Sequence, residues 1–292
     1  MAKVTDAELT AYIEEKLQKL HLSRLKKLKE LSLKEILERK NPYLFKAKHV
    51  TTAAEFIESV LDAFLSSQEE TRFGTFLEGL AIFICSKAFG GYKSSAKGID
   101  LEFDRDRIHY IVSIKSGPNW GNAGQIEKMR TNFQQAKRIL NTNRSKQNIV
   151  AVNGCLYGRE ATEDKGDYLK LCGQRFWEFI SEQETLYTDL IEPLGVRAKE
   201  RKEEFQVELA KVKNRLTKEF LNSFCTKDDG INWKRVVQYN SSIIPPLQDY
   251  AEHEYGVTGG QLDRFAARMN KELAAERKAG RLKPFTGKLK RG

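Results

Sequence analysis

The chain has 292 residues and a mass of 33.5 kDa, about twice the size of a typical domain, so one large domain or a core with a second lobe is expected. Hydrophobic residues make up 40% and charged residues 31%, which is too apolar for a disordered chain and too charged for a membrane protein. The longest strongly apolar stretch, around 80–85, is much shorter than the roughly 20 residues that cross a bilayer. Because the N-terminus also lacks a secretory signal, we predict a cytoplasmic protein that does not enter a membrane.

The cysteines and the charge distribution narrow the class further. The 4 cysteines form no CxxC pair and have no histidines at zinc-finger spacing, so we interpret them as reduced thiols; a zinc site gathered from distant segments is the alternative. The net charge of +10 is concentrated at the ends, since residues 1–50 hold 12 Lys/Arg against 7 Asp/Glu and residues 261–292 hold 10 against 3. These basic ends are candidates for contact with a polyanion, or simply a solvated surface.

The first third of the chain is predicted to be helical. Leucines and isoleucines recur at helical spacing over the first 40 residues, a break follows at Asn41-Pro42, and further helices are expected at 52–67 and 72–89. Glu78 lies inside the helix at 72–89, which Gly90-Gly91 should end as a C-terminal cap.

The pattern then changes to period two. Two β-rich runs surround the charged sequence DRDR and predict a β-hairpin with strands at 99–103 and 108–114. Beyond it, periodicity and composition predict an amphipathic helix, two more strands, a helix and a long surface helix, in that order at 126–140, 148–155, 168–172, 174–182 and 197–223. The fold class is therefore α/β. We expect a helical N-terminal region at 1–70, a core at 71–185 and a helical C-terminal region with a basic tail at 186–292.

The hairpin carries residues whose types and spacing suit catalysis. Ser113 and Lys115 are two residues apart on one strand and therefore share a face. Asp100, at the start of the partner strand, is expected to meet Lys115 at one end of the sheet. A carboxylate that binds a divalent cation, next to a lysine that holds a phosphate oxygen or a water, suits phosphodiester hydrolysis. Mg²⁺ is usually held by one or two carboxylates, and the candidates for the second are Glu78 and Glu127, with Glu102 on the face of Asp100.

The sequence around this hairpin resembles the PD-(D/E)xK nuclease superfamily, and within it the type II restriction endonucleases of the PmeII type. The strings FGTFLEG, GIDLEF, SIKSGPNW and FWEFIS occur in the expected order between about residues 70 and 185. The resemblance implies a restriction-endonuclease-like core, in which a mixed sheet is flanked by helices, with helical additions at both ends. It matches Asp100, Ser113 and Lys115 to the active-site motif, with serine in place of the second acid. This SxK variant recruits a glutamate from the next helix, which favours Glu127, whereas the apolar surroundings of Glu78 favour that residue.

The resemblance implies a Mg²⁺-dependent, sequence-specific double-strand DNA endonuclease. It also implies a homodimer on a palindromic site and a cognate DNA methyltransferase in the same restriction-modification system. Two alternatives stay open: a non-specific repair or recombination nuclease of the same fold, and an inactive DNA-binding module in which the serine marks a lost site. If the hairpin has no active site, Asp100 and Lys115 are an ordinary surface pair.

Residues after the catalytic strand are candidates for DNA contact. Six Lys or Arg and no acid occur between residues 128 and 146, and four of them are predicted to contact phosphates: Lys128, Arg130, Lys137 and Arg138. A solvated helix face is the alternative. In the turn-rich segment that follows the strand, Asn119 and Trp120 are candidates for DNA contact, unless Trp120 packs on the core. His109 is interpreted as structural.

Overall fold

The computed structural model describes residues 3–143 and 148–241 of the chain. They divide into two compact units: one combines the residues up to Glu30 with Leu65–Ala210, and the other combines Leu31–Phe64 with the residues from Lys211 onward. The predicted boundary at residue 70 lies inside a helix, and the predicted three segments stay a prediction. The basic tail predicted at the C-terminus lies outside the described residues, as do Arg144 and Lys146.

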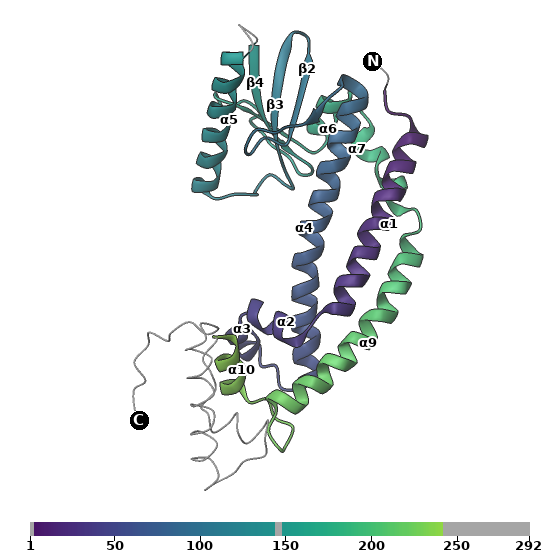
Figure 1. The fold of residues 1–292 in the computed structure, drawn as a ribbon, viewed down its shortest axis with the longest axis vertical. Helices are drawn as coiled ribbons and strands as arrows, with labels where there is room; N and C mark the ends of the chain where they lie inside the picture. Colours follow the sequence, from purple (N-terminus) through teal and green to yellow (C-terminus); the bar gives the residue numbers. More distant parts are fainter. Residues whose placement is uncertain (1–2, 144–147, 242–292) are drawn as a thin grey trace, which may run out of the picture. The chain divides into compact units, whose positions relative to one another are not determined.

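A five-stranded mixed sheet forms the centre of the first unit (Figure 1). Its order is β1-β2-β3-β4-β5, in which β1, β2 and β3 pair antiparallel, whereas β3, β4 and β5 pair parallel. The strands are β1 (Tyr92–Lys93), β2 (Leu101–Arg105), β3 (Ile108–Lys115), β4 (Asn148–Cys155) and β5 (Leu169–Cys172). The predicted α/β class, with a mixed sheet flanked by helices, is confirmed.

The hairpin of β2 and β3 forms in the predicted segment, but β2 begins and ends two residues later than predicted, so that the first half of DRDR belongs to the strand. Asp106 and Arg107 connect the strands with φ angles of 53° and 64°, the left-handed pair that matches the twist of a two-residue hairpin. Side chains on one face of β3, including Val112 and Ile114, pack in a core cluster with helix α4, whereas Ile111 packs on the other face with helix α5. The sheet therefore lies between helices (Figure 1).

Helix α4 (Ala53–Phe89) corrects one prediction. The sequence suggested separate helices at 52–67 and 72–89, but the polar segment between them contains neither glycine nor proline, so nothing interrupts the backbone hydrogen bonds and one helix of 37 residues results. It ends as predicted at Gly90, whose φ is 69°. Helix α5 (Ala123–Asn143) and helix α6 (Gln174–Ser181) agree closely with their predicted positions.

The remaining helices flank the sheet or build the second unit. They are α1 (Asp6–Glu30), α2 (Leu33–Arg39), α3 (Pro42–Ala47), α7 (Leu186–Asp189), α8 (Ile191–Gly195), α9 (Ala198–Phe224) and α10 (Trp233–Asn240). In the second unit, an aromatic cluster forms the core: the ring of Phe56 contacts those of Phe45, Phe220 and Trp233. No helix in the described part of the chain is long and apolar enough to span a membrane.

Candidate active site

Asp100 is fixed at the open end of the hairpin by two backbone contacts. Its N–H donates to the Val112 carbonyl at 2.8 Å, and its Oδ2 accepts from the Ile114 N–H at 2.7 Å. Leu101 pairs with Val112, and continuing this register places Asp100 opposite Ser113. The first predicted acid therefore stands next to the strand that carries the serine and the lysine.

Ser113 and Lys115 share a face of β3, as their spacing predicts. Ser113 is only 1% exposed, so its hydroxyl belongs to the interior of the sheet. Lys115 is the last residue of β3 and is half-buried. Its Nζ lies 5.2 Å from the centre of the Trp120 ring, within the range of a cation–π contact.

Helix α4 supplies the second acid of this cluster. The side chain of Glu78 is 28% exposed, and its Oε1 lies 3.7 Å from Lys93 Nζ of β1. Burial raises the pKa of Glu78 above its ordinary value, and the negative charge of Asp100 adds to the rise, whereas Lys93 and Lys115 act against it. These electrostatic couplings join Glu78, Asp100, Lys93 and Lys115, which we call the hairpin-end cluster.

Glu127 occupies a different environment. It is exposed on α5, and its backbone carbonyl accepts a hydrogen bond from Thr131 Oγ1 within the helix. The charges that influence the pKa of Glu78 are those of Asp100, Lys93 and Lys115, and Glu127 is not among them. The structure therefore brings Glu78 together with the hairpin residues and leaves Glu127 on the helix surface.

Glu102 belongs to a second carboxylate cluster on the same hairpin. It is buried and accepts hydrogen bonds from Tyr92 Oη at 3.2 Å and from Ser94 Oγ. Its Oε2 also lies 3.0 Å from Nε2 of the fully buried His109, whose Nδ1 contacts Asp104 at 2.8 Å. We call this set the His109 cluster. The structural role predicted for His109 stays a prediction, and Glu102 contacts Tyr92, Ser94 and His109 rather than the hairpin-end cluster.

The donor set of the hairpin-end cluster fits Mg²⁺. In the described part of the chain, no three His, Cys, Asp or Glu side chains gather as a metal cage. Mg²⁺, however, keeps several waters and takes one or two carboxylates, with substrate phosphates completing its shell. Asp100 and Glu78 are two such carboxylates, and burial together with the nearby charge of Asp100 raises the pKa of Glu78, an unfavourable situation for the charged form that a bound cation would relieve. The zinc site considered as an alternative for the cysteines gains no support.

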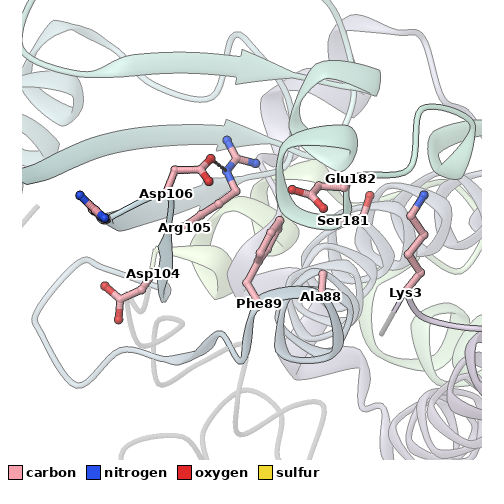
Figure 2. A pocket seen from close by; sticks show the side chains of 9 residues that line it. Lys3, Ala88, Phe89, Asp104, Arg105, Asp106, Ser181 and Glu182 are labelled. Atoms are coloured by element: carbon pink, nitrogen blue, oxygen red, sulfur yellow. Dashed lines mark ion pairs between the residues drawn. The ribbon is translucent and has the colours of Figure 1, made fainter. Parts of the chain in front are cut away.

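A pocket of about 410 Å³ lies at the turn end of the hairpin (Figure 2). Arg105 stands in it at 3.7 Å from Asp106 and covers the ring of Phe89. The pocket also receives Asp104 and Glu182, so its charges are mixed. None of the described residues that line this pocket belongs to the hairpin-end cluster. The predicted catalytic residues therefore lie outside it.

A comparison with known protein families identifies the family of this chain. The family described as type II restriction endonuclease EcoO109I matches residues 7–202, which contain the whole sheet and every predicted catalytic residue. The chain belongs to this family. No curated protein matches it significantly.

Members of the EcoO109I family are type II restriction endonucleases, so the chain is a site-specific deoxyribonuclease. This confirms the broader resemblance inferred from the hairpin. The PmeII type and the recruitment of a helix glutamate by the SxK motif stay predictions. The match ends within α9, and the residues from 203 onward lie beyond it.

The basic residues of α5 separate into two groups in this EcoO109I-family fold. Arg130 Nε lies 3.3 Å from Asp167 Oδ2, and Lys137 Nζ donates to the Asp167 carbonyl at 3.4 Å, so both hold the loop before β5. Lys128 and Arg138 are exposed, as is Asn119 in the loop after β3. The predicted basic face is therefore partly structural.

Sequence analysis missed two residues next to the site. Asn153 of β4 is 1% exposed, lies beside Ser113 in the parallel register, and donates through Nδ2 to the Ser113 carbonyl at 3.2 Å. Its signal was a polar residue directly after the apolar segment IVAV, inside a predicted buried strand. Lys93 gave no recognisable signal, because β1 has only 2 residues and shows no periodicity.

Proposed function

We propose that this protein catalyses the Mg²⁺-dependent, sequence-specific hydrolysis of phosphodiester bonds in double-stranded DNA. The observation that carries the proposal is the hairpin-end cluster, in which the charges of Asp100, Lys93 and Lys115 act on Glu78, in a chain of the EcoO109I family. Two neighbouring carboxylates, one of which has a pKa raised by burial, form a suitable cation site.

Asp100 and Glu78 would hold the metal ion, which supplies Lewis-acid stabilisation of the phosphate and an activated water. Lys115 would hold and orient the attacking water with its ammonium group, and the same charge would stabilise the pentacovalent phosphorus as negative charge develops. Ser113 fills the usual position of the second acid with a neutral hydroxyl, and we propose that it holds water there. Glu78 would then supply the missing carboxylate, and Glu127 remains the alternative that the SxK resemblance suggests.

DNA would be held by positive side chains next to the cleavage site. Lys128 and Arg138 are exposed on the helix that follows the catalytic strand, and nothing acidic lies between them in the sequence. We propose that they contact phosphates, and that Asn119 contacts DNA from the loop. Trp120, Arg130 and Lys137 were predicted for the same role, but each already contacts protein groups, which makes them weaker candidates.

A homodimer follows from the chemistry of double-strand cleavage. Each strand needs its own active site, and a two-fold axis supplies two equivalent sites on a palindromic sequence. A DNA methyltransferase that protects the same sequence would be the functional partner. Analytical ultracentrifugation with and without a cleaved oligonucleotide tests the dimer.

Digestion of a phage DNA in Mg²⁺, followed by mapping of the ends, tests the proposed function. Discrete fragments with a common end sequence are expected, and no fragments in EDTA. A smear would instead support the non-specific nuclease, and binding without cleavage in Mg²⁺ or Mn²⁺ would support the inactive DNA-binding module. Asp100→Ala is the matched control, because it removes the first carboxylate and leaves the rest of the chain unchanged.

A further inference from the structure

We infer that Trp120 and Asn153 are positioning residues for cleavage: the indole of Trp120 holds the ammonium group of Lys115, and Asn153 holds the indole. This inference rests on the proposed function, since it assigns Trp120 a role through Lys115. It differs from the DNA contact predicted for Trp120 from the sequence.

The first step is the contact between the lysine and the ring. Lysine ends a flexible four-carbon stem, so its charge has no fixed position unless a neighbour defines one. The Lys115 Nζ lies 5.2 Å from the centre of the Trp120 ring. The negative face of an indole attracts an ammonium group, more strongly where both are partly shielded from water, and both of these side chains are half-buried.

The second step is the anchoring of the ring itself. Trp120 Nε1 donates to Asn153 Oδ1 at 3.0 Å, and Asn153 Nδ2 in turn donates to the Ser113 carbonyl at 3.2 Å. Asn153 is 1% exposed and pairs with Ser113 across the parallel strands, so its amide cannot turn freely. The ring also packs on the cluster around Met129. The strand that carries Lys115 therefore determines, through Asn153, where the indole stands.

The third step is the support of the loop that carries Trp120. Lys170 Nζ donates to the Pro118 carbonyl at 3.0 Å, and the same ammonium lies 2.8 Å from Glu160 Oε2. The ring of Tyr157 lies so close to Gly117 that a Cβ at that position would approach it to 2.5 Å. The loop is thus held by a hydrogen bond at Pro118 and by the close packing of Tyr157 at Gly117. These two contacts limit the movement of the segment that carries the indole.

Substitutions that separate the ring face from the ring N–H test this assignment. Trp120→Leu removes both, and we expect single-turnover cleavage to slow roughly tenfold, the effect of losing a shielded cation–π contact, with DNA affinity unchanged. Trp120→Phe keeps a ring face and should restore most of the rate. Asn153→Ala should slow cleavage at least as much as Trp120→Phe, and the two changes together should be less than additive, because both remove the hydrogen bond between Trp120 and Asn153.

The Lys115→Ala background is the matched control. If Trp120 acts through Lys115, adding Trp120→Leu to Lys115→Ala leaves the residual cleavage rate and the DNA affinity unchanged, whereas a purely structural role would lower the rate again. Weaker DNA binding by Trp120→Leu would overturn the inference in favour of a DNA contact. A Lys115→Ala variant that cuts normally refutes the proposed function. An inactive Lys115→Ala with a fully active Trp120→Leu refutes the positioning role alone. If Trp120→Leu does not fold, the double-mutant cycle of Trp120→Phe and Asn153→Ala tests the inference instead. Additive effects of these two substitutions on the cleavage rate would overturn it.

Discussion

Two carboxylate clusters on one hairpin differ in how their charges are satisfied. In the His109 cluster, hydroxyl and imidazole groups surround the buried Glu102. In the hairpin-end cluster, burial raises the pKa of Glu78, and the negative charge of Asp100 adds to the rise. Hydrogen-bond donors can compensate the buried charge of Glu102, whereas Glu78 and Asp100 are two half-buried like charges that a cation would stabilise. This difference is the reason that we propose the hairpin end as the catalytic site and expect the His109 cluster to act in stability.

The largest effects are expected from the hairpin-end cluster. Asp100→Ala and Lys115→Ala should each reduce cleavage roughly a hundredfold or more, since each removes a charge directed at the transition state. DNA binding should largely survive in Lys115→Ala. Initial cleavage rates on plasmid DNA, with circular dichroism as a control for folding, measure this. A near wild-type rate in either variant would break the assignment.

A smaller effect separates the two candidate glutamates. Glu78→Gln should raise the Mg²⁺ concentration needed for half-maximal cleavage by about tenfold or more, because loss of a ligand costs at least as much as loss of a supporting group. Glu127→Gln is the matched control on the following helix and should change it little. Metal titrations of both variants compare them directly. The reverse result would move the second carboxylate to α5 and support the SxK resemblance in detail.

The raised pKa of Glu78 predicts a pH dependence of the metal requirement. Mg²⁺ binds the deprotonated carboxylate, and a pKa above the ordinary value means that protons compete already at higher pH. As pH falls toward this pKa, the required Mg²⁺ should increase, by at most about tenfold per pH unit below it. Glu78→Gln should lack this dependence. Metal titrations at a series of pH values above 5 measure it, and identical curves for wild type and variant would contradict it.

The His109 cluster should respond in stability rather than in catalysis. Glu102→Gln replaces an acceptor of three hydrogen bonds by an amide that cannot match all of its donors, and should lower the free energy of unfolding by roughly 1–3 kcal/mol. Cleavage below the unfolding transition should stay near the wild-type rate. Urea denaturation and cleavage assays together measure the two quantities. Loss of cleavage without loss of stability would place Glu102 in the active site after all.

The smallest effect concerns a surface outside both clusters. Replacing Lys128 and Arg138 with Gln should weaken DNA binding equally on all sequences and lower the salt slope by roughly one unit per lost phosphate contact. Specificity should not change, because phosphate contacts position a protein and base contacts specify its site. Filter binding at several salt concentrations measures this. An unchanged slope would identify α5 as a solvated helix face.

Local patterns predicted the parts of the site that depend on neighbouring residues. Alternation in β3 put Ser113 and Lys115 on one face, and the charged DRDR segment marked the position of the hairpin turn, of which only Asp106 and Arg107 form the two-residue connection. The apolar run at 148–155 predicted β4 at its observed bounds. The prediction of two helices where α4 forms was wrong at their junction. The polar residues there interrupt the apolar stripe, so the stripe gave no sign that the helix continues.

The sequence by itself determined the α/β class, the hairpin and the strand face that Ser113 and Lys115 share. Side-chain direction along a strand or a helix follows from backbone geometry alone. Only the tertiary structure decided which glutamate joins Asp100, and that Asn153 and Trp120 stand against Lys115. Those pairings join residues from different elements, and their distances depend on how α4 and β4 pack against the hairpin. Periodicity states which way a residue points, whereas packing determines what it meets.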